Sequence, residues 1–246
     1  MDRGIWALWY ELSDENKSEY LDWFHRVHVA EKLSRPGYLW AAHYELGHGG
    51  SRFKQVVDGL HHAREPGLGR GGGYLALFGG LTTHTFLNPS PGQLARRQSP
   101  ETRRMIGLRR EIYSCIFAEE TRVDGPDLAK RGPGITPGLA IQMGNFNVAS
   151  PEAEDDVGAW YAQYRLPFVA AMPGCTGARK LLATAGWGKH SILYEFVSLE
   201  EREERFIPHE ETAHDPKSWT ARVLAQLRHA PCSPAVGRRI WPAVQT

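Results

Sequence analysis

A histidine-bearing stretch near the start of the chain offers acid or base chemistry. Residues 23–28 read Trp-Phe-His-Arg-Val-His and continue an amphipathic helical pattern. At 100° per residue Phe24 and Val27 mark the buried face, His25 faces away from it, and His28 lies on its border. An imidazole at a pocket edge can exchange protons near neutral pH. We therefore predict His28 as a catalytic residue, with a histidine bonded to a backbone carbonyl as the alternative.

Glu31 is a second candidate because it falls on the same helical face, one turn after His28. A carboxylate at a core-facing position must pair with a cation, reach solvent or hold a proton. Solvent exposure is favoured, since the helix must end before Pro36. If Glu31 were buried beside His28, the two would form an acid/base pair.

The segment from 38 to 45 reads as a strand that could line a pocket. Alternation puts Trp40 and Tyr44 on one face together with Tyr38, and His43 on the other. His84 follows the next strand, where loops reach pocket mouths, although surface exposure is favoured. We take Trp40, Tyr44, His43 and His84 as candidate substrate-binding residues.

The chain carries a repeat of two blocks that match without gaps. The first block pairs Ser13 with Ser150, Trp23 with Trp160 and Pro36 with Pro173, a first offset of 137. The later block pairs Leu77 with Leu193 and Leu108 with Leu224, a second offset of 116. The difference, 137 − 116 = 21, predicts an insertion of that length in the first copy, within about 46–73. We interpret the pattern as a duplicated domain.

Each copy shows the order βαββαβ of a ferredoxin-like unit. The expected strands are 5–12, 38–45 and 74–81 in the first copy and 139–148, 175–183 and 190–197 in the second, with later helices at 100–112 and 216–229 and a weak last strand in each. A Pro/Gly-rich linker at 124–138 separates lobe 1–123 from lobe 139–246. The predicted fold class is α+β, two tandem ferredoxin-like lobes whose sheets cover each other as a pseudo-dimeric α/β barrel.

The insertion contains His48, His61 and His62 and a glycine run at 67–73. The glycines precede a strand, so they do not form a dinucleotide fingerprint. The histidines could gather a transition metal with His43. No cysteine pair or His-Glu-x-x-His spacing supports this, so we predict no metal and favour a mobile lid or a dimer arm.

Composition restricts the partner and the compartment. The 29 basic and 28 acidic residues nearly balance, which argues against nucleic acid and anionic membranes. No apolar run approaches the roughly 20 residues that cross a bilayer, and the start lacks a signal-peptide pattern. Three widely spaced cysteines favour reduced thiols. We expect a cytoplasmic protein that takes a hydrophobic small molecule, with a homo-oligomer left open.

The motif at 23–28, the pair Pro36-Gly37 and the strand at 74–78 together resemble the EthD-like branch of the dimeric α/β-barrel superfamily. In that branch a proline follows two residues after the helix histidine. The first copy has Ala30 at that place, whereas the second has Pro167 but Arg165 instead of the histidine. Only the first copy keeps the family histidine, so we expect an asymmetric protein with its site in the first lobe.

The resemblance implies a small-molecule enzyme that uses acid/base chemistry without a cofactor on a hydrophobic carbonyl or aromatic substrate. Cyclisation, dehydration, isomerisation and cofactor-free oxygenation all occur on such barrels, and the fold cannot choose among them. Trp23 is a further candidate wall, and Arg165 a candidate anion contact. Two alternatives stay open: a haem-linked enzyme of the same superfamily, and a ligand-binding or stress-associated module without catalysis.

Overall fold

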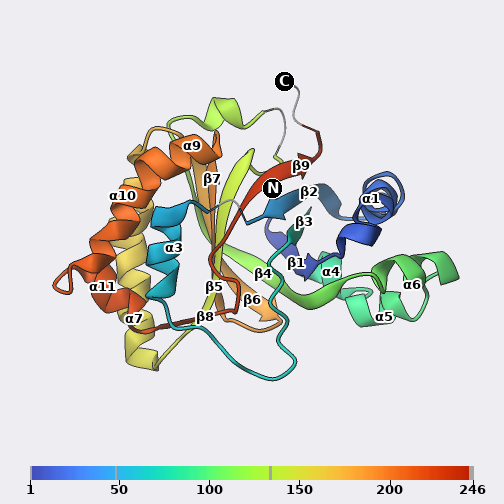
Figure 1. The fold of residues 1–246 in the computed structure, drawn as a ribbon, viewed down its shortest axis with the longest axis horizontal. Helices are drawn as coiled ribbons and strands as arrows, with labels where there is room; N and C mark the ends of the chain where they lie inside the picture. The colour runs from blue at the N-terminus through green and yellow to red at the C-terminus, as the bar shows by residue number, and fades with distance from the viewer. Residues whose placement is uncertain (1, 48, 133–134, 244–246) are drawn as a thin grey trace.

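The computed structural model describes residues 2–47, 49–132 and 135–243. It contains a barrel of antiparallel strands with helices on two opposite sides (Figure 1). The strands are β1 Gly4–Glu11, β2 Tyr38–Leu46, β3 Tyr74–Gly80, β4 Arg110–Asp124, β5 Ala140–Val148, β6 Cys175–Ala185, β7 His190–Phe196, β8 Leu227–His229 and β9 Ala235–Trp241.

Helices of the first half gather on one side of the barrel: α1 Asp14–Trp23, α2 Val29–Leu33, α4 His84–Leu87, α5 Pro91–Ala95 and α6 Pro100–Ile106. The other side carries α3 Ser51–Asp58, α7 Pro151–Trp160, α8 Leu166–Ala171, α9 Leu199–Glu201, α10 Ile207–Glu210 and α11 Trp219–Leu224. Three π-helical turns lie at Phe24–His28, Tyr161–Arg165 and Arg202–Phe206, and 3₁₀ turns at Leu128–Arg131 and Glu211–His214. None of the helices in the described ranges is long and apolar enough to span a membrane.

Eight strands close the barrel in the order β7-β6-β4-β1-β3-β2-β9-β5, because β5 also pairs with β7. The last long strand of each lobe pairs with one strand of its own lobe and one strand of the other. Strand β4 pairs with β1 and with β6, and β9 pairs with β5 and with β2. The sheets of the two lobes therefore form one continuous surface. This confirms the predicted fold class, a mixed α+β barrel.

The core has three layers. Alternate side chains of both lobes fill the barrel interior, where Trp9 stacks on Tyr113 at 4.4 Å between ring centroids. The opposite faces of the strands pack under the helices, one cluster in each lobe. Because strand side chains alternate, each strand contributes both to the shared interior and to its own lobe's outer layer.

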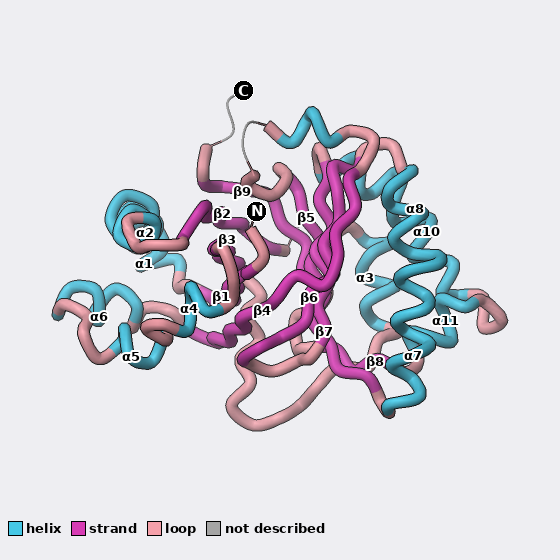
Figure 2. The backbone as a smooth tube through the Cα atoms, turned by 180° about the vertical axis from the view of Figure 1, so that it is seen from behind, coloured by secondary structure: helices cyan, strands magenta, loops and turns pink. Residues whose placement is uncertain are grey.

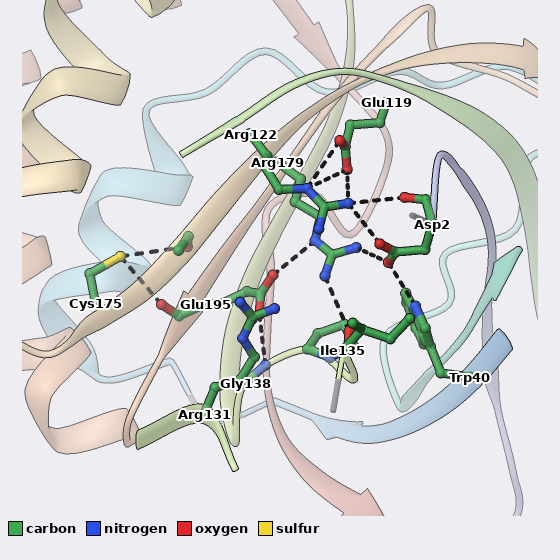
Figure 3. Close-up of polar contacts among 12 residues, drawn as sticks. Asp2, Trp40, Glu119, Arg122, Arg131, Ile135, Gly138, Cys175, Arg179 and Glu195 are labelled. Carbon is green, nitrogen blue, oxygen red and sulfur yellow. Dashed lines mark hydrogen bonds and ion pairs between the residues drawn. The ribbon is translucent and has the colours of Figure 1, made fainter. Parts of the chain in front are cut away.

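A buried charge network ties the lobes together at one end of the barrel (Figure 3). Asp2 accepts hydrogen bonds from Trp40 Nε1 (2.8 Å), Arg122 Nη2 (2.9 Å) and Arg179 Nη1 (2.5 Å). Arg179 Nε also donates to Glu195 Oε1 at 3.1 Å. Asp2 precedes β1, whereas Arg179 and Glu195 belong to β6 and β7, so the network joins the start of the first lobe to the sheet of the second.

Matched elements keep the two spacings of the sequence. Helices α1 and α7 begin at Asp14 and Pro151, and the π turns that follow them begin at Phe24 and Tyr161, so both pairs repeat the first offset. Strands β3 and β7 repeat the second. We interpret these spacings as a duplication with lobes at 1–123 and 139–246. The segment 124–138 between β4 and β5 holds the 3₁₀ turn, and residues 133–134 of that expected linker lie outside the described residues.

Three local predictions were wrong. The helix expected at 100–112 ends at Ile106, and the one expected at 216–229 is α11, which ends at Leu224. In both places strand pairing overrides helical patterning, because the following residues pair with β1 and with β5. Tyr38 does not share a face with Trp40. A bulge lies between them, so Tyr38 packs under the helices while Trp40 points into the barrel.

The insertion of the first lobe crosses to the second lobe. Helix α3, drawn in cyan, lies beside α10 and α11 rather than beside α1 and α2 (Figures 1 and 2). Phe53 packs with Ile207 and Val236, and Arg52 donates two hydrogen bonds to Glu211 at 2.8 and 2.6 Å. The first lobe therefore supplies part of the cover of the second.

Candidate functional site

A π-helical turn sets which helix residues face the sheet in each lobe. Its i→i+5 hydrogen bonds insert one residue more than an α-helical turn. Val27, expected on the buried face, is 49% exposed, whereas His28 is 4% exposed. In the second lobe Tyr164 is 36% exposed and Arg165 is 3% exposed. His28 and Arg165 are thus the matched residues that the two turns bury.

His28 lies among aromatic rings. Its ring centroid is 4.9 Å from that of Trp23 and 5.5 Å from that of Phe24, and its Nδ1 has no hydrogen-bond partner among the described residues. Burial lowers the pKa of His28 to about 2, and the positive charge of Arg109 adds to the effect. The imidazole is therefore neutral at pH 7 and resists protonation. Its role as proton carrier stays a prediction.

The other helix candidate and the loop candidate lie at the surface. Glu31 is exposed and accepts a hydrogen bond from Arg35 Nη2 at 2.8 Å. The π turn explains this, because it rotates the following residues relative to an uninterrupted α-helix. His84 begins α4 and is also exposed. Glu31 remains beside a cavity with His28, whereas none of the cavities described below includes His84.

The three aromatic wall candidates, Trp23, Trp40 and Tyr44, do not line one pocket. Trp40 and Tyr44 point into the barrel, where Trp40 donates to Asp2 and Tyr44 donates to the Gly138 carbonyl at 2.9 Å. Trp23 packs under the helices of the first lobe. The predicted walls therefore belong to two different layers of the protein.

His43 also lies under the first-lobe helices, on the face predicted for it. Its Nε2 is 2.7 Å from Tyr10 Oη and its Nδ1 is 2.8 Å from His25 Nε2. Burial holds the pKa of His43 well below its usual range. His25 was expected to face away from the core, but the π turn brings it half-buried against His43. These contacts satisfy His43 within the fold.

The second lobe contains an apolar cavity between its sheet and its helices. It is lined from β5 and β7, from α7 and its π turn, from α11 and β8, and from α3 of the insertion. The lining residues are Val56, Leu60, Gln142, Gly144, Phe146, Trp160, Tyr161, Arg165, Ile192, Tyr194, Glu210, Thr220, Leu224, Leu227, His229 and Pro234. Arg165 is the sequence-predicted residue that this cavity contains.

Four of the lining residues hold a buried polar atom without a hydrogen-bond partner among the described residues: Trp160 Nε1, Arg165 Nη1, Thr220 Oγ1 and His229 Nε2. An unpaired buried polar group costs about 1–3 kcal/mol, and most such groups in native proteins are satisfied. Their concentration around one apolar cavity is the pattern of a ligand site, with a few polar groups on an apolar wall.

A polar chain holds Arg165 in place. Its guanidinium forms an ion pair with Glu210, and its Nε donates to Tyr194 Oη at 2.9 Å. Glu210 also accepts from Gln142 Nε2 at 3.3 Å, and Gln142 Oε1 accepts from Arg202 at 3.0 and 2.6 Å. Within the described part of the chain, Nη1 of Arg165 is left free to donate to a ligand.

His229 presents a neutral imidazole to the same cavity. Its backbone is fixed by the end of the insertion, since its N–H donates to the His61 carbonyl at 2.7 Å. Its Nδ1 is 3.5 Å from Ser233 Oγ, which itself accepts from the Asn145 backbone N–H at 2.7 Å. Burial lowers the pKa of His229 to about 3, and the nearby imidazole of His62 adds to this. The imidazole is neutral at pH 7, and its free Nε2 accepts or donates a hydrogen bond according to the tautomer.

The cavity leaves about 40 Å³ of free volume, room for about three water molecules. Neither a porphyrin nor a three-ring aromatic molecule fits this volume without a movement of the lining residues. The described residues contain no group of three or more His, Cys, Asp and Glu side chains that could hold a metal ion. His62 Nε2 donates to the Ser233 carbonyl at 2.8 Å, His61 is exposed, and His48 lies outside the described residues.

Most residues of this cavity could not be identified from the sequence. The helix predicted at 216–229 includes His229, whereas His229 ends β8 and pairs with Phe146 of β5. Two signals were available. The first offset aligned Arg165 with His28, and Ser150 with its following proline marked the helix that carries Arg165. Neither signal could locate Thr220 or His229 beside it.

No family model matches the chain, and no curated protein matches it. Its structure is similar to that of an anthrone oxidase-like protein, with a TM-score of 0.61, 10% identity and coverage of 97% of this chain and 91% of the other. A protein of Fusobacterium nucleatum provisionally named a monooxygenase has a TM-score of 0.55 at 7% identity, covering 97% and 93%. A protein provisionally named a chlorite dismutase has a TM-score of 0.56 at 12% identity, covering 98% and 96%. The likeness extends over nearly the whole chain, so this protein has the dimeric α/β-barrel fold.

Proposed function

We propose that the second-lobe cavity binds a hydrophobic, oxygen-bearing aromatic molecule and catalyses a proton transfer on it without a cofactor. The observation that carries the proposal is the set of four polar atoms, unpartnered within the described chain, on a wall that is largely apolar and also carries the paired side chains Gln142 and Glu210. An aromatic ligand with one or two carbonyl or hydroxyl groups would satisfy these atoms and bury its rings against Phe146, Ile192 and Leu227.

The proposed chemistry follows from the two titratable groups. His229 is neutral at pH 7. It would take a proton from an acidic C–H or O–H of the ligand because the ligand anion formed beside it raises the pKa of the imidazole. Arg165 stays protonated, so its free N–H can stabilise the negative charge that the ligand oxygen then develops. A base and an oxyanion donor in one cavity are the minimum that enolisation of a ketone requires.

The cavity must widen to admit such a ligand. Val56, Leu60 and Leu224 line it and also line a neighbouring cavity of about 190 Å³. A shift of α3 would merge the two spaces. The insertion is therefore the part of the chain that we propose controls access.

The structural likeness to an anthrone oxidase-like protein suggests the first substrate to test. Anthrone carries an acidic methylene group opposite its carbonyl. Removal of a methylene proton gives an anion that dioxygen can oxidise, and the balanced reaction is anthrone plus O₂ to anthraquinone plus water. Formation of anthraquinone can be followed by absorbance in air-saturated buffer.

The decisive comparison is between His229→Gln and His28→Gln. The second-lobe proposal expects a loss of about 10²- to 10⁴-fold in turnover for His229→Gln, while binding of anthraquinone, followed by tryptophan fluorescence, is retained. The first-lobe prediction expects the loss in His28→Gln instead. Binding without turnover in the wild-type protein would support the non-catalytic module. Absence of both binding and turnover across a panel of oxygenated aromatics would overturn the proposal.

A further inference from the structure

We infer a second ligand site, for a phosphate-bearing small molecule, in the cavity of the first lobe between α2 and the α5–α6 segment. This cavity is separate from the apolar one, since it lies on the opposite side of the barrel (Figures 1 and 2). Its free volume is about 330 Å³. It is lined by His28, Glu31, Lys32, Arg35, Leu94, Arg97, Gln98, Ser99 and Thr102.

Charge is the first argument. Lys32, Arg35 and Arg97 bring three positive charges to the lining, and Glu31 brings one negative charge. With His28 neutral and Lys32 protonated, the lining has a net charge of about +2, which matches a phosphate monoester dianion. Arg and Lys with neighbouring hydroxyl groups are the usual donor set for such a group.

Burial is the second argument. Lys32 is 5% exposed, and no ion pair or hydrogen bond of its ammonium is found among the described residues; the ammonium lies 4.8 Å from the centroid of the Trp6 ring. A buried charge is normally paired. His28, 4% exposed, lines the same cavity, and its Nδ1 has no partner in the described ranges. The wall of this cavity thus carries an ammonium without an anionic partner and an imidazole nitrogen without a hydrogen-bond partner among the described residues, and a bound anion would pair with the ammonium.

Comparison of the lobes is the third argument. At the first offset Lys32 corresponds to Val169 and Arg35 to Met172, both buried and apolar. The fold therefore accepts apolar residues at these positions. A lysine that only packed would be a costly substitute for valine at a buried position, so its charge points to a ligand.

The electrostatics of Lys32 fit an anion. Burial first and the charge of Arg35 second lower the pKa of Lys32 to about 7, against the opposing effect of Glu31. A phosphate dianion beside the ammonium would stabilise its charged form and raise that pKa. Binding should therefore take up protons near pH 7.

The test is isothermal titration calorimetry of the full chain with inorganic phosphate and with phenyl phosphate at pH 7. We expect saturable binding at one site, weakened at least tenfold in Lys32→Met, which keeps the packing on Trp6 while removing the charge. Lys217→Met is the matched control, because Lys217 is exposed on the other lobe. Arg97→Gln, at an exposed position, gives a second variant whose folding should not depend on the substitution.

Further arms distinguish the ligand chemistry. Acetate and citrate replace phosphate to test whether any carboxylate suffices, and titrations in two buffers of different ionisation enthalpy count the protons taken up. Tighter binding of carboxylates than of phosphates would overturn the phosphate assignment. No saturable binding of either phosphate, or equal weakening in Lys32→Met and Lys217→Met, would overturn the site itself.

Discussion

His28 and Arg165 occupy the same position in two π-helical turns related by the first offset, and the turns bury both side chains against the sheet. The surroundings differ. His28 faces Lys32 and Arg35 at a basic cavity, whereas Arg165 is paired with Glu210 at an apolar one. The same π-helical turn thus places a histidine at one cavity and an arginine at the other.

Replacement of His28 by Phe should make the protein less sensitive to mild acid. The pKa of His28 is lowered from 6.5 to about 2, chiefly by burial. Below pH 6.5 His28 binds a proton in the unfolded chain but not in the folded one, so the free energy of unfolding falls as the pH falls. At pH 5 this loss is roughly 2 kcal/mol for one such histidine. Urea unfolding at pH 7 and pH 5 should show a difference smaller by about that amount in His28→Phe.

Equal pH dependence in the wild-type and His28→Phe proteins would contradict the buried neutral histidine. The measurement should use phosphate-free buffer, because His28 also lines the basic cavity.

Asp2→Asn should destabilise the barrel strongly. The side chain is 1% exposed and accepts from Arg122, Arg179 and Trp40. Burial by itself would raise the pKa of Asp2, but Arg179 and the hydrogen bonds lower it from 3.8 to about 2. Removing one partner of a buried ion pair costs about 3–5 kcal/mol. Unfolding by urea at pH 7 measures the loss.

Acid titration gives an independent measure of the same network. Because the folded pKa of Asp2 lies below the unfolded one, its stabilisation is present above about pH 4 and is lost as the pH falls toward 2, a change of roughly 2 kcal/mol. Asp22→Asn is the matched control, since Asp22 pairs with Arg26 at the exposed surface and such pairs contribute less than about 1 kcal/mol. A loss in Asp2→Asn no larger than in this control would refute the network's role.

The order of elements could be predicted from the sequence because local signals are strong there. Ser150 accepts from the Ala153 N–H as the N-cap of α7, followed by Pro151 in the first turn. The two offsets then carried this assignment to the other copy. Strand exchange of β4 and β9 between lobes left no sequence signal, since pairing partners far apart in the chain are fixed only by the assembled barrel.

The site could be predicted less well, for two physical reasons. A π turn differs from an α turn by one residue, and that residue reversed the expected exposure of Val27 relative to His28. The apolar cavity also depends on contacts between distant segments: Val56 of the insertion meets Thr220 and His229 of the second lobe. Helical phase and strand alternation relate only residues that are close in sequence. They therefore could not predict that these distant residues line one cavity.

Phe53→Ala should loosen α3 and speed ligand access to the apolar cavity. The Phe53 ring lies 4.3 Å from the Arg202 guanidinium and packs with Ile207 and Val236. Truncation of a buried Phe costs about 3–5 kcal/mol, and the loss should fall mainly on the docking of α3. Hydrogen exchange in residues 51–58 should accelerate, and the association rate of an aromatic ligand should rise. Leu81→Ala, at a half-exposed position directly after β3, should change neither quantity.

The rate of the proposed reaction should be independent of pH between about 5 and 8. His229 acts as a base in its neutral form, and its pKa is lowered to about 3, first by burial and then by His62 and His61. The neutral form therefore predominates throughout that range, and kcat/KM should decline only as the pH approaches 3, provided that the protein remains folded. Between pH 5 and 8 His229→Gln should lower kcat/KM by the same factor at each pH, and the decline toward pH 3 should be absent from the variant. A wild-type profile that falls by half between pH 6 and 7 would show that a histidine with an ordinary pKa carries the proton, and would exclude His229 from that role.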